Sequence, residues 1–134
     1  MQGTYLITGG EGFIGRNIKQ YLMKNSCNAL TLDIHGKPDF MISVTDFPSL
    51  MDIDEEFDGI FHLAATTSPP QFEDDPLGGF NVNANGTLNI LEYAKRKKDK
   101  ESGACILIRN IRQFWKHIKG GDHPPDLFKS LSHN

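Results

Sequence analysis

Apolar and polar residues alternate along the chain with two different periods. Short apolar runs, of a length that suits buried strands, occupy residues 4–8, 29–32, 40–44, 57–63 and 104–108. The segments between these runs carry helix signals, so strands and helices alternate along the chain. Alternation of this kind predicts a parallel sheet with helices packed on its faces.

The first helix is predicted to begin near Gly12. Four apolar residues then recur at helical spacing and are expected to face the sheet. They are Ile14, Ile18, Tyr21 and Leu22. Residues 25–28 interrupt this pattern and end the helix. Asp46 is predicted to cap a short second helix that runs through Leu50 and Met51.

A longer helix is predicted after the fourth strand. Asp75 and Pro76 supply a capping side chain and a first-turn proline. The helix is expected to reach about Lys97, either straight or bent near Gly86, and residues 64–74 before it are predicted to form a loop. Five strands connected in this way predict a doubly wound sheet in the order 3-2-1-4-5.

A glycine-rich stretch, residues 8–15, joins the first strand to the first helix. Two patterns overlap in it. Gly9, Gly12 and Gly15 fit GxxGxxG, and Gly10, Gly12 and Gly15 fit GxGxxG. Glycine permits a positive φ and lets the backbone approach a pyrophosphate, and Gly15 is expected to permit close packing of helix and strand. N–H groups at the start of a helix attract an anion. The strand–turn–helix context therefore predicts a dinucleotide-phosphate site.

An acidic residue, Asp33, ends the second predicted strand. It follows Gly15 at close to the spacing of about 20 residues at which a carboxylate accepts hydrogen bonds from an adenosine ribose. The same carboxylate would repel the 2′-phosphate of NADP, and the nearest cation, Lys37, lies in a predicted turn. The sequence therefore favours NAD over NADP as the cofactor.

Length, charge and cysteine content narrow the function classes. The chain has 134 residues, about one domain, with a net charge of -3 and a pI of about 5.9. This balance does not favour nucleic acid or an anionic membrane as the main partner. No secretory signal or membrane-spanning run is recognised, and two separated cysteines suit a reducing, cytoplasmic location. The histidine spacing suits no metal site, so no metal is expected.

Three motifs carry a resemblance to a known family. They are residues 8–15, the segment His62-Leu63-Ala64-Ala65, and Asp75-Pro76 followed by residues 83–92. In these motifs the chain resembles the extended short-chain dehydrogenase/reductase family, the group of NAD-dependent epimerases and dehydratases that act on nucleotide sugars. The resemblance implies a Rossmann-like fold, NAD as the cofactor and a nucleotide sugar as a further ligand.

The resemblance also implies roles for individual residues. Phe13 and Ile14 would present backbone amides to the pyrophosphate. Ser43 and Val44 would border the adenine, although the family usually has aspartate at position 43. Asn83 would meet the cofactor from the long helix. The path to the nicotinamide ribose would be lined by Leu63, Ala64, Ala65 and Thr67. The implied cofactor-binding set is Gly9, Gly12, Phe13, Ile14, Gly15, Asp33, Ser43, Val44, Leu63, Ala64, Ala65, Thr67 and Asn83.

No catalytic residue is assigned to this chain. The family uses a Tyr-xxx-Lys pair after the fifth strand, in which the tyrosine is the general acid/base and the lysine lowers its pKa. The one such spacing here, Tyr93 and Lys97, precedes the fifth strand, so Tyr93 is interpreted as helix packing. His62 is likewise interpreted as a packed residue at the end of a strand.

The family pattern is truncated after about five strands. Residues 1–108 are predicted to form an NAD-binding domain, and residues 109–134 an atypical tail with a short helix over about 110–119. The tail is either the product of a shifted reading frame or a genuine variant. The chain is interpreted as the NAD-binding part of an epimerase/dehydratase, and alternatively as a non-catalytic NAD-binding module, sensor or remnant. An unpaired fifth strand and an apolar tail helix predict a homo-oligomer.

Overall fold

The computed structural model describes residues 3–98 and 107–108. Five parallel strands form one sheet in the order β3-β2-β1-β4-β5. The strands are β1 (Thr4–Thr8), β2 (Asn28–Asp33), β3 (Phe40–Met41), β4 (Gly59–His62) and β5 (Leu107–Ile108). The strand order predicted from the sequence is therefore confirmed.

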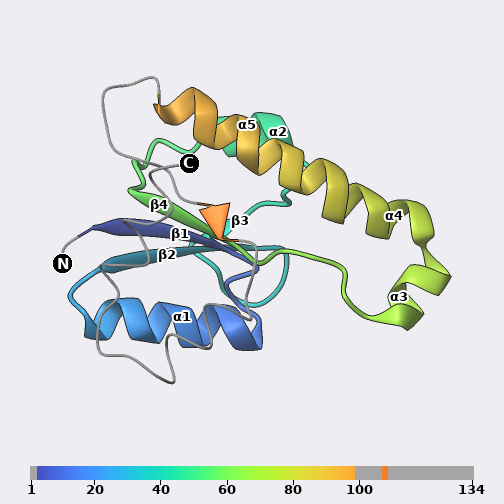
Figure 1. The fold of residues 1–134 in the computed structure, drawn as a ribbon, viewed down its shortest axis with the longest axis horizontal. Coiled ribbons are helices and arrows are strands. Elements are labelled where there is room, and N and C mark those ends of the chain that lie inside the picture. Colours follow the sequence, from blue (N-terminus) through green and yellow to red (C-terminus); the bar gives the residue numbers. More distant parts are fainter. Residues whose placement is uncertain (1–2, 99–106, 109–134) are drawn as a thin grey trace.

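Helices cover both faces of this sheet. Figure 1 shows α1 (Phe13–Lys24) on one face, with α2 (Phe47–Met51) and α5 (Gly86–Lys98) on the other. The remaining helical segments are α3 (Pro69–Asp74), α4 (Pro76–Phe80) and the π-helical η1 (Asn81–Asn85). This three-layered arrangement confirms the predicted doubly wound α/β fold.

One hydrophobic core lies between α1 and the sheet. Ile18 and Leu22 of α1 are buried there, and Ile14 packs against them. The strands contribute Tyr5, Ile7, Ala29 and Phe61 to the same core. Three of the four residues predicted to face the sheet therefore do so, whereas Tyr21 is half-buried and is not part of this core.

A second core lies on the opposite face of the sheet. Because successive strand residues point to opposite sides, Leu6 faces this core while its neighbour Ile7 faces the first. The other buried members are Leu32, Val44, Leu50, Ile53, Ile60, Ile90 and Tyr93. Strands buried on both faces explain why they appear in the sequence as continuous apolar runs.

Two strands are shorter than the apolar runs predicted. β3 ends at Met41 instead of residue 44, because the chain turns where the Thr45 N–H donates to the Ser43 Oγ at 3.2 Å. β4 covers Gly59–His62 instead of residues 57–63. Of the predicted fifth strand, residues 104–106 lie outside the described residues.

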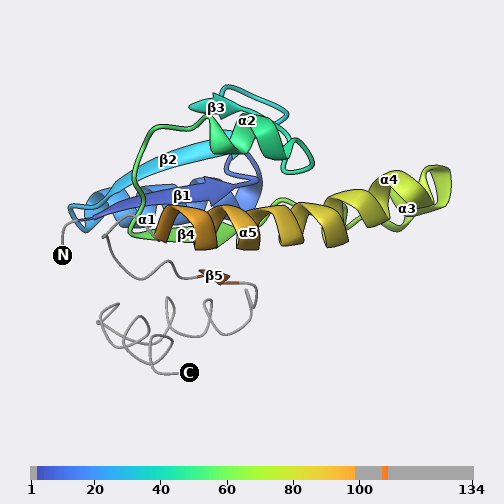
Figure 2. The same ribbon diagram turned by 90° about the horizontal axis from the view of Figure 1, so that it is seen from above.

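The region before the long helix differs from the prediction. Residues 64–74 were expected to form a loop, but α3 occupies its second half and begins with a proline in its first turn. Asp75 caps α4, as predicted, by accepting a hydrogen bond from the Gly78 N–H at 3.0 Å. The sequence left open whether the long helix bends near Gly86, and the structure has a π-helical segment, η1, that ends directly before this glycine. Figures 1 and 2 show α3 and α4 extending beyond the sheet.

Several expectations concern residues outside the described ones. The predicted tail, its helix over residues 110–119 and the division into two domains all fall there. In the described sheet β5 lies at an edge, as expected. An edge strand is compatible with self-association but does not test it, so self-association stays a prediction. No helix in the described ranges has the length and apolar character that crossing a membrane requires.

Candidate functional site

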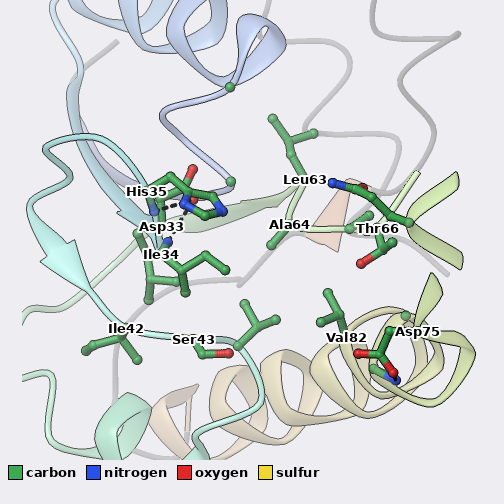
Figure 3. A pocket seen from close by; sticks show the side chains of 18 of the residues that line it. Asp33, Ile34, His35, Ile42, Ser43, Leu63, Ala64, Thr66, Asp75 and Val82 are labelled. Atoms are coloured by element: carbon green, nitrogen blue, oxygen red, sulfur yellow. Dashed lines mark hydrogen bonds between the residues drawn. The ribbon is translucent and has the colours of Figure 1, made fainter. Parts of the chain in front are cut away.

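A pocket of about 640 Å³ lies at the carboxyl ends of the strands. β1 lies between β2 and β4, so the crossover connections diverge here, which is where ligands bind in doubly wound sheets. Figure 3 shows Asp33 and His35 on one side of the pocket and Leu63, Ala64 and Thr66 on the other. The volume is within the range of small-molecule and cofactor sites, roughly 300–1,000 Å³.

Eight of the thirteen predicted cofactor-binding residues line this pocket. They are Gly9, Gly12, Asp33, Ser43, Val44, Leu63, Ala64 and Ala65. These residues come from four separate segments at the carboxyl ends of the strands β1 to β4, where Asp33 is the last residue of β2 and the others follow their strands. The fold therefore brings together positions that are far apart in the sequence.

The other five predicted residues do not line the pocket. The Phe13 side chain is 78% exposed, and Ile14 packs against the core beneath α1. Only the main-chain amides of these two residues were expected to act. Thr67 is exposed, whereas its neighbour Thr66 lines the pocket. Gly15 and Asn83 lie behind the pocket wall and are described below.

The glycine loop, residues 9–12, packs closely against its surroundings at its first two positions. Gly9 has a φ of +67°, and a Cβ on it would lie 2.8 Å from the Ala64 nitrogen. A Cβ on Gly10 would lie 2.5 Å from the Thr31 Cγ2. Of the two overlapping glycine patterns, Gly9 therefore provides the left-handed turn, and Gly10 allows the loop to pack on β2.

Gly12 is the open position of the glycine loop. Among the described residues, a Cβ on Gly12 would meet just the Gly9 carbonyl oxygen, at 3.3 Å. The first helical hydrogen bond of α1 runs from the Arg16 N–H to the Gly12 carbonyl. The N–H groups of residues 13–15 therefore have no acceptor within the helix. Open space beside such N–H groups suits a phosphate.

Gly15 packs closely against the glycine loop. A Cβ on Gly15 would lie 2.6 Å from both the Gly10 Cα and the Gly9 carbonyl oxygen. Glycine at this position therefore lets the start of α1 approach the loop that precedes it. The close packing of helix and strand that the sequence predicted for Gly15 stays a prediction.

Asp33 ties the glycine loop to the end of β2. Its Oδ2 accepts a hydrogen bond from the Glu11 N–H at 3.0 Å. Its Oδ1 accepts from the N–H groups of Ile34 and His35, at 2.7 and 3.2 Å. A carboxylate offers about four acceptor positions, so one remains for a ligand hydroxyl. The dashed lines in Figure 3 mark bonds of this carboxylate at the pocket rim.

A directed chain of hydrogen bonds runs through His62. The Thr8 Oγ1 accepts from the N–H groups of Leu63 and Ala64, at 3.1 and 3.2 Å, which occupies both of its lone pairs. Its 2.7 Å contact with the His62 Nδ1 is then an O–H donation to the ring. With Nδ1 as the acceptor, the Nε2 of the ring, 3.1 Å from the Thr87 Oγ1, is assigned as the donor of the next hydrogen bond. His62 is 6% exposed, as its interpretation as a packed residue requires.

Asn83 holds the pocket wall from behind. Its Oδ1 accepts from the Thr66 N–H and its Nδ2 donates to the Thr66 carbonyl, both at 2.8 Å. Thr87 joins this arrangement by donating its hydroxyl to the Asn83 carbonyl at 2.7 Å. The predicted direct contact of Asn83 with a cofactor is untested, but its amide group is already used to fix Thr66.

The α3–α4 segment forms a pocket wall that sequence reasoning missed. Its lining residues are Gln71, Asp74, Asp75, Gly78 and Gly79. Phe72 packs against Gly79, where a Cβ would lie 2.7 Å from the ring. The one available signal was the Ser68-Pro69 pair, which is typical of a helix start.

Tyr93 and Lys97 lie near the C-terminal end of α5, where they make packing contacts, and they do not line the pocket. Tyr93 is 1% exposed in the second core. The Lys97 Nζ donates to the carbonyl of Ile53 at 2.7 Å and to that of Met51 at 3.4 Å. This supports the interpretation of Tyr93 as helix packing. In residues 3–98, no group of three or more His, Cys, Asp or Glu side chains is arranged to hold a metal ion.

Comparison with known proteins agrees with this geometry. A sequence model of the NAD dependent epimerase/dehydratase family matches residues 5–105. UDP-glucuronic acid decarboxylase 6 of Arabidopsis thaliana is 33% identical over 123 residues, covering 82% of this chain and 34% of that protein. UDP-glucuronic acid decarboxylase 1 of Danio rerio is 33% identical over 122 residues, covering 82% and 28%. The chain thus spans about a third or less of the length of these two curated relatives.

A solved structure is similar over the same region. The UDP-glucose 4-epimerase of Thermus thermophilus, solved in complex with NAD, superposes with a TM-score of 0.64. The two sequences are 28% identical, and the match covers 71% of this chain and 34% of the epimerase. The described fold is therefore shared with an enzyme that binds NAD.

Proposed function

The chain belongs to the NAD-dependent epimerase/dehydratase family, and on that premise we propose that it forms the NAD-binding part of a nucleotide-sugar enzyme. One observation carries the proposal. Gly12, which comes directly before the first-turn N–H groups of α1, lines the pocket, and Asp33 stands at the rim of the same pocket. A pyrophosphate and an adenosine ribose need these two features side by side.

The pocket residues fit the parts of NAD in order. The pyrophosphate would lie against Gly12 and the amides of Phe13 and Ile14. The adenosine ribose would donate to Asp33, and Ser43 with Val44 would border the adenine. The wall from Leu63 to Thr66, held by Asn83, would flank the nicotinamide half. When bound, NAD supplies a hydride acceptor.

The substrate of the whole enzyme is proposed to be a nucleotide sugar. The relatives named above act on UDP-glucuronic acid or UDP-glucose, as their names state. Among the described residues, Gln71 and Asp74 of α3 offer polar groups to the pocket beyond the wall at Thr66. We assign no described residue as a general acid or base.

We expect this chain to bind NAD at least about tenfold more tightly than NADP, a difference of about 1.4 kcal/mol. The cause is repulsion between the Asp33 carboxylate and a 2′-phosphate. Isothermal titration with both cofactors measures the ratio. In Asp33→Ala the ratio should fall toward one, whereas Asp54→Ala, at an exposed position outside the pocket, should leave it unchanged. Tighter binding of NADP by the unaltered chain would contradict the assignment.

We expect no interconversion or decarboxylation of UDP-sugars by this chain with NAD. Tyr93, the one tyrosine with a lysine four positions later, is buried in the core and cannot meet a substrate. Chromatography of UDP-glucose and UDP-glucuronic acid after incubation tests this. Turnover that disappears in Tyr93→Phe would show that the pair is catalytic. The absence of turnover together with NAD binding is also what the alternative function, a non-catalytic NAD-binding module, predicts.

A further inference from the structure

The glycine loop contains an acidic residue, Glu11, between Gly10 and Gly12. A carboxylate in a loop that is proposed to bind a pyrophosphate should weaken binding, because like charges repel. Glu11 is nevertheless absent from the residues that line the pocket. Its side chain is turned onto β2, where its Oε1 accepts a hydrogen bond from the Thr31 Oγ1 at 3.2 Å.

Gly36 makes the space for this side chain. A Cβ on Gly36 would lie 2.9 Å from the Glu11 Oε2 and 3.0 Å from its Cγ. The φ of Gly36 is +73°, so the turn after β2 also needs the conformational freedom of glycine. The turn thus passes directly over the Glu11 side chain, and Gly36 has no side chain that would occupy the same space.

A second carboxylate, Asp39, approaches the same hydroxyl. The Asp39 Oδ2 lies 3.2 Å from the Thr31 Oγ1 and accepts the Thr31 N–H at 2.8 Å. The Lys19 Nζ lies 3.5 Å from the same Oδ2. Burial acts to raise the pKa of Asp39, but the bonds from Thr31 and the charge of Lys19 hold this pKa below its usual value.

One hydroxyl proton therefore faces two negative groups. Asp39 has other donors in the Thr31 N–H and Lys19, whereas the Thr31 hydroxyl is the one donor found for the Glu11 carboxylate within the described part of the chain. Without that hydroxyl, Glu11 would face Asp39 with no donor between them. Its side chain would then have no described hydrogen bond to keep it on β2.

We propose that Thr31 and Gly36 hold the Glu11 carboxylate away from the phosphate-binding face of the glycine loop. Both are positioning residues, and they act on affinity through the charge of Glu11. This inference rests on the proposed function, because it assumes that a pyrophosphate binds at this loop. It predicts that losing either residue weakens the binding of ligands that carry a pyrophosphate and spares an uncharged ligand.

The test compares ligands of different charge on the same variants. In Thr31→Val, which keeps the side-chain shape, we expect NAD and ADP to bind about five- to tenfold more weakly, while adenosine binding changes by less than about twofold. The losses should shrink at high salt, since repulsion between exposed charges is screened. Adding Glu11→Gln to Thr31→Val should restore the affinity for NAD and ADP.

A second pair of variants tests the same idea from the other side of the crevice. Gly36→Ala should expel the Glu11 side chain and produce the same charge-dependent loss, which Glu11→Ala should reverse. Titration calorimetry measures NAD and ADP, chemical-shift titration measures adenosine, and thermal unfolding confirms that each variant is folded. Thr31→Ser, which keeps the hydroxyl, is the matched control.

Two results would overturn this inference and leave the proposed function intact. One is an equal loss for adenosine and NAD, which would mean that the substitutions simply deform the pocket. The other is a selective loss for NAD that survives removal of the Glu11 charge. Failure of the unaltered chain to bind NAD would instead overturn the proposed function, and this inference with it.

Discussion

Replacing Gly12 with alanine is expected to abolish measurable NAD binding while the protein stays folded. The Cβ would enter the open space beside the first turn of α1, where the pyrophosphate is proposed to lie. In the described part of the chain the Cβ would meet just the Gly9 carbonyl oxygen, at 3.3 Å, which a shift of a few tenths of an ångström relieves. The φ of Gly12, -75°, is accessible to alanine. The free energy of unfolding should change by less than about 1 kcal/mol, the size of a helix-cap effect.

Gly15→Ala provides the contrast, because its Cβ has no space at all. Contacts of 2.6 Å with two backbone atoms of the glycine loop force the loop or α1 to move. Overpacking of this kind costs about 1–3 kcal/mol, so this variant should lose both stability and NAD affinity.

Urea unfolding and titration calorimetry, measured on both variants, separate the two mechanisms. Phe13→Ala is the control, since this side chain is largely exposed and its proposed role belongs to the backbone. NAD binding of unchanged affinity by Gly12→Ala would place the pyrophosphate elsewhere.

Most of the fold could be predicted from local sequence patterns. The strands are buried on both faces, so Leu6 and Ile7 both read as strand residues although they serve different cores. The α1 face was predictable because Ile18 and Leu22 recur at helical spacing. Gly9 and Gly15 were predictable because backbone geometry, and not a partner side chain, requires glycine at both positions.

The α3–α4 wall shows where this approach fails. α3 has six residues and buries none of them, so it has no apolar periodicity for a sequence pattern to detect. It is instead fixed by contacts such as that of Phe72 with Gly79. The pocket residues Gln71 and Asp74 were missed for this reason.

The role of Asn83 could not be read from the sequence either. An amide can serve a ligand or the protein backbone equally well, because it both donates and accepts. The choice depends on where Thr66 lies, and Thr66 is brought next to Asn83 by the α3–α4 excursion and the π-helical segment η1. A side-chain bond between two such segments follows from the assembled fold and has no local signature.

Thr8→Val is expected to lower the free energy of unfolding by about 2–4 kcal/mol, the cost of leaving buried polar groups without partners. Thr8 is fully buried, and its hydroxyl is the acceptor for the Ala64 N–H and the donor to the His62 Nδ1. Valine has nearly the same shape as threonine, so the loss of stability measures the contribution of the hydroxyl and not the cost of a cavity. Leu63 should be affected less, since its N–H also donates to the Thr8 carbonyl at 3.1 Å.

Thr8→Ser keeps the hydroxyl and should retain most of the stability that Thr8→Val loses. Urea unfolding measures the difference, and the nitrogen chemical shifts of the His62 ring report its tautomer directly. In the unaltered chain and in Thr8→Ser we expect the proton on Nε2, because the Thr8 hydroxyl then donates to Nδ1. Equal stability of Thr8→Val and Thr8→Ser, or a proton on Nδ1 in the unaltered chain, would contradict the directed chain. The wall at Ala64 would then have to be held in place by packing alone.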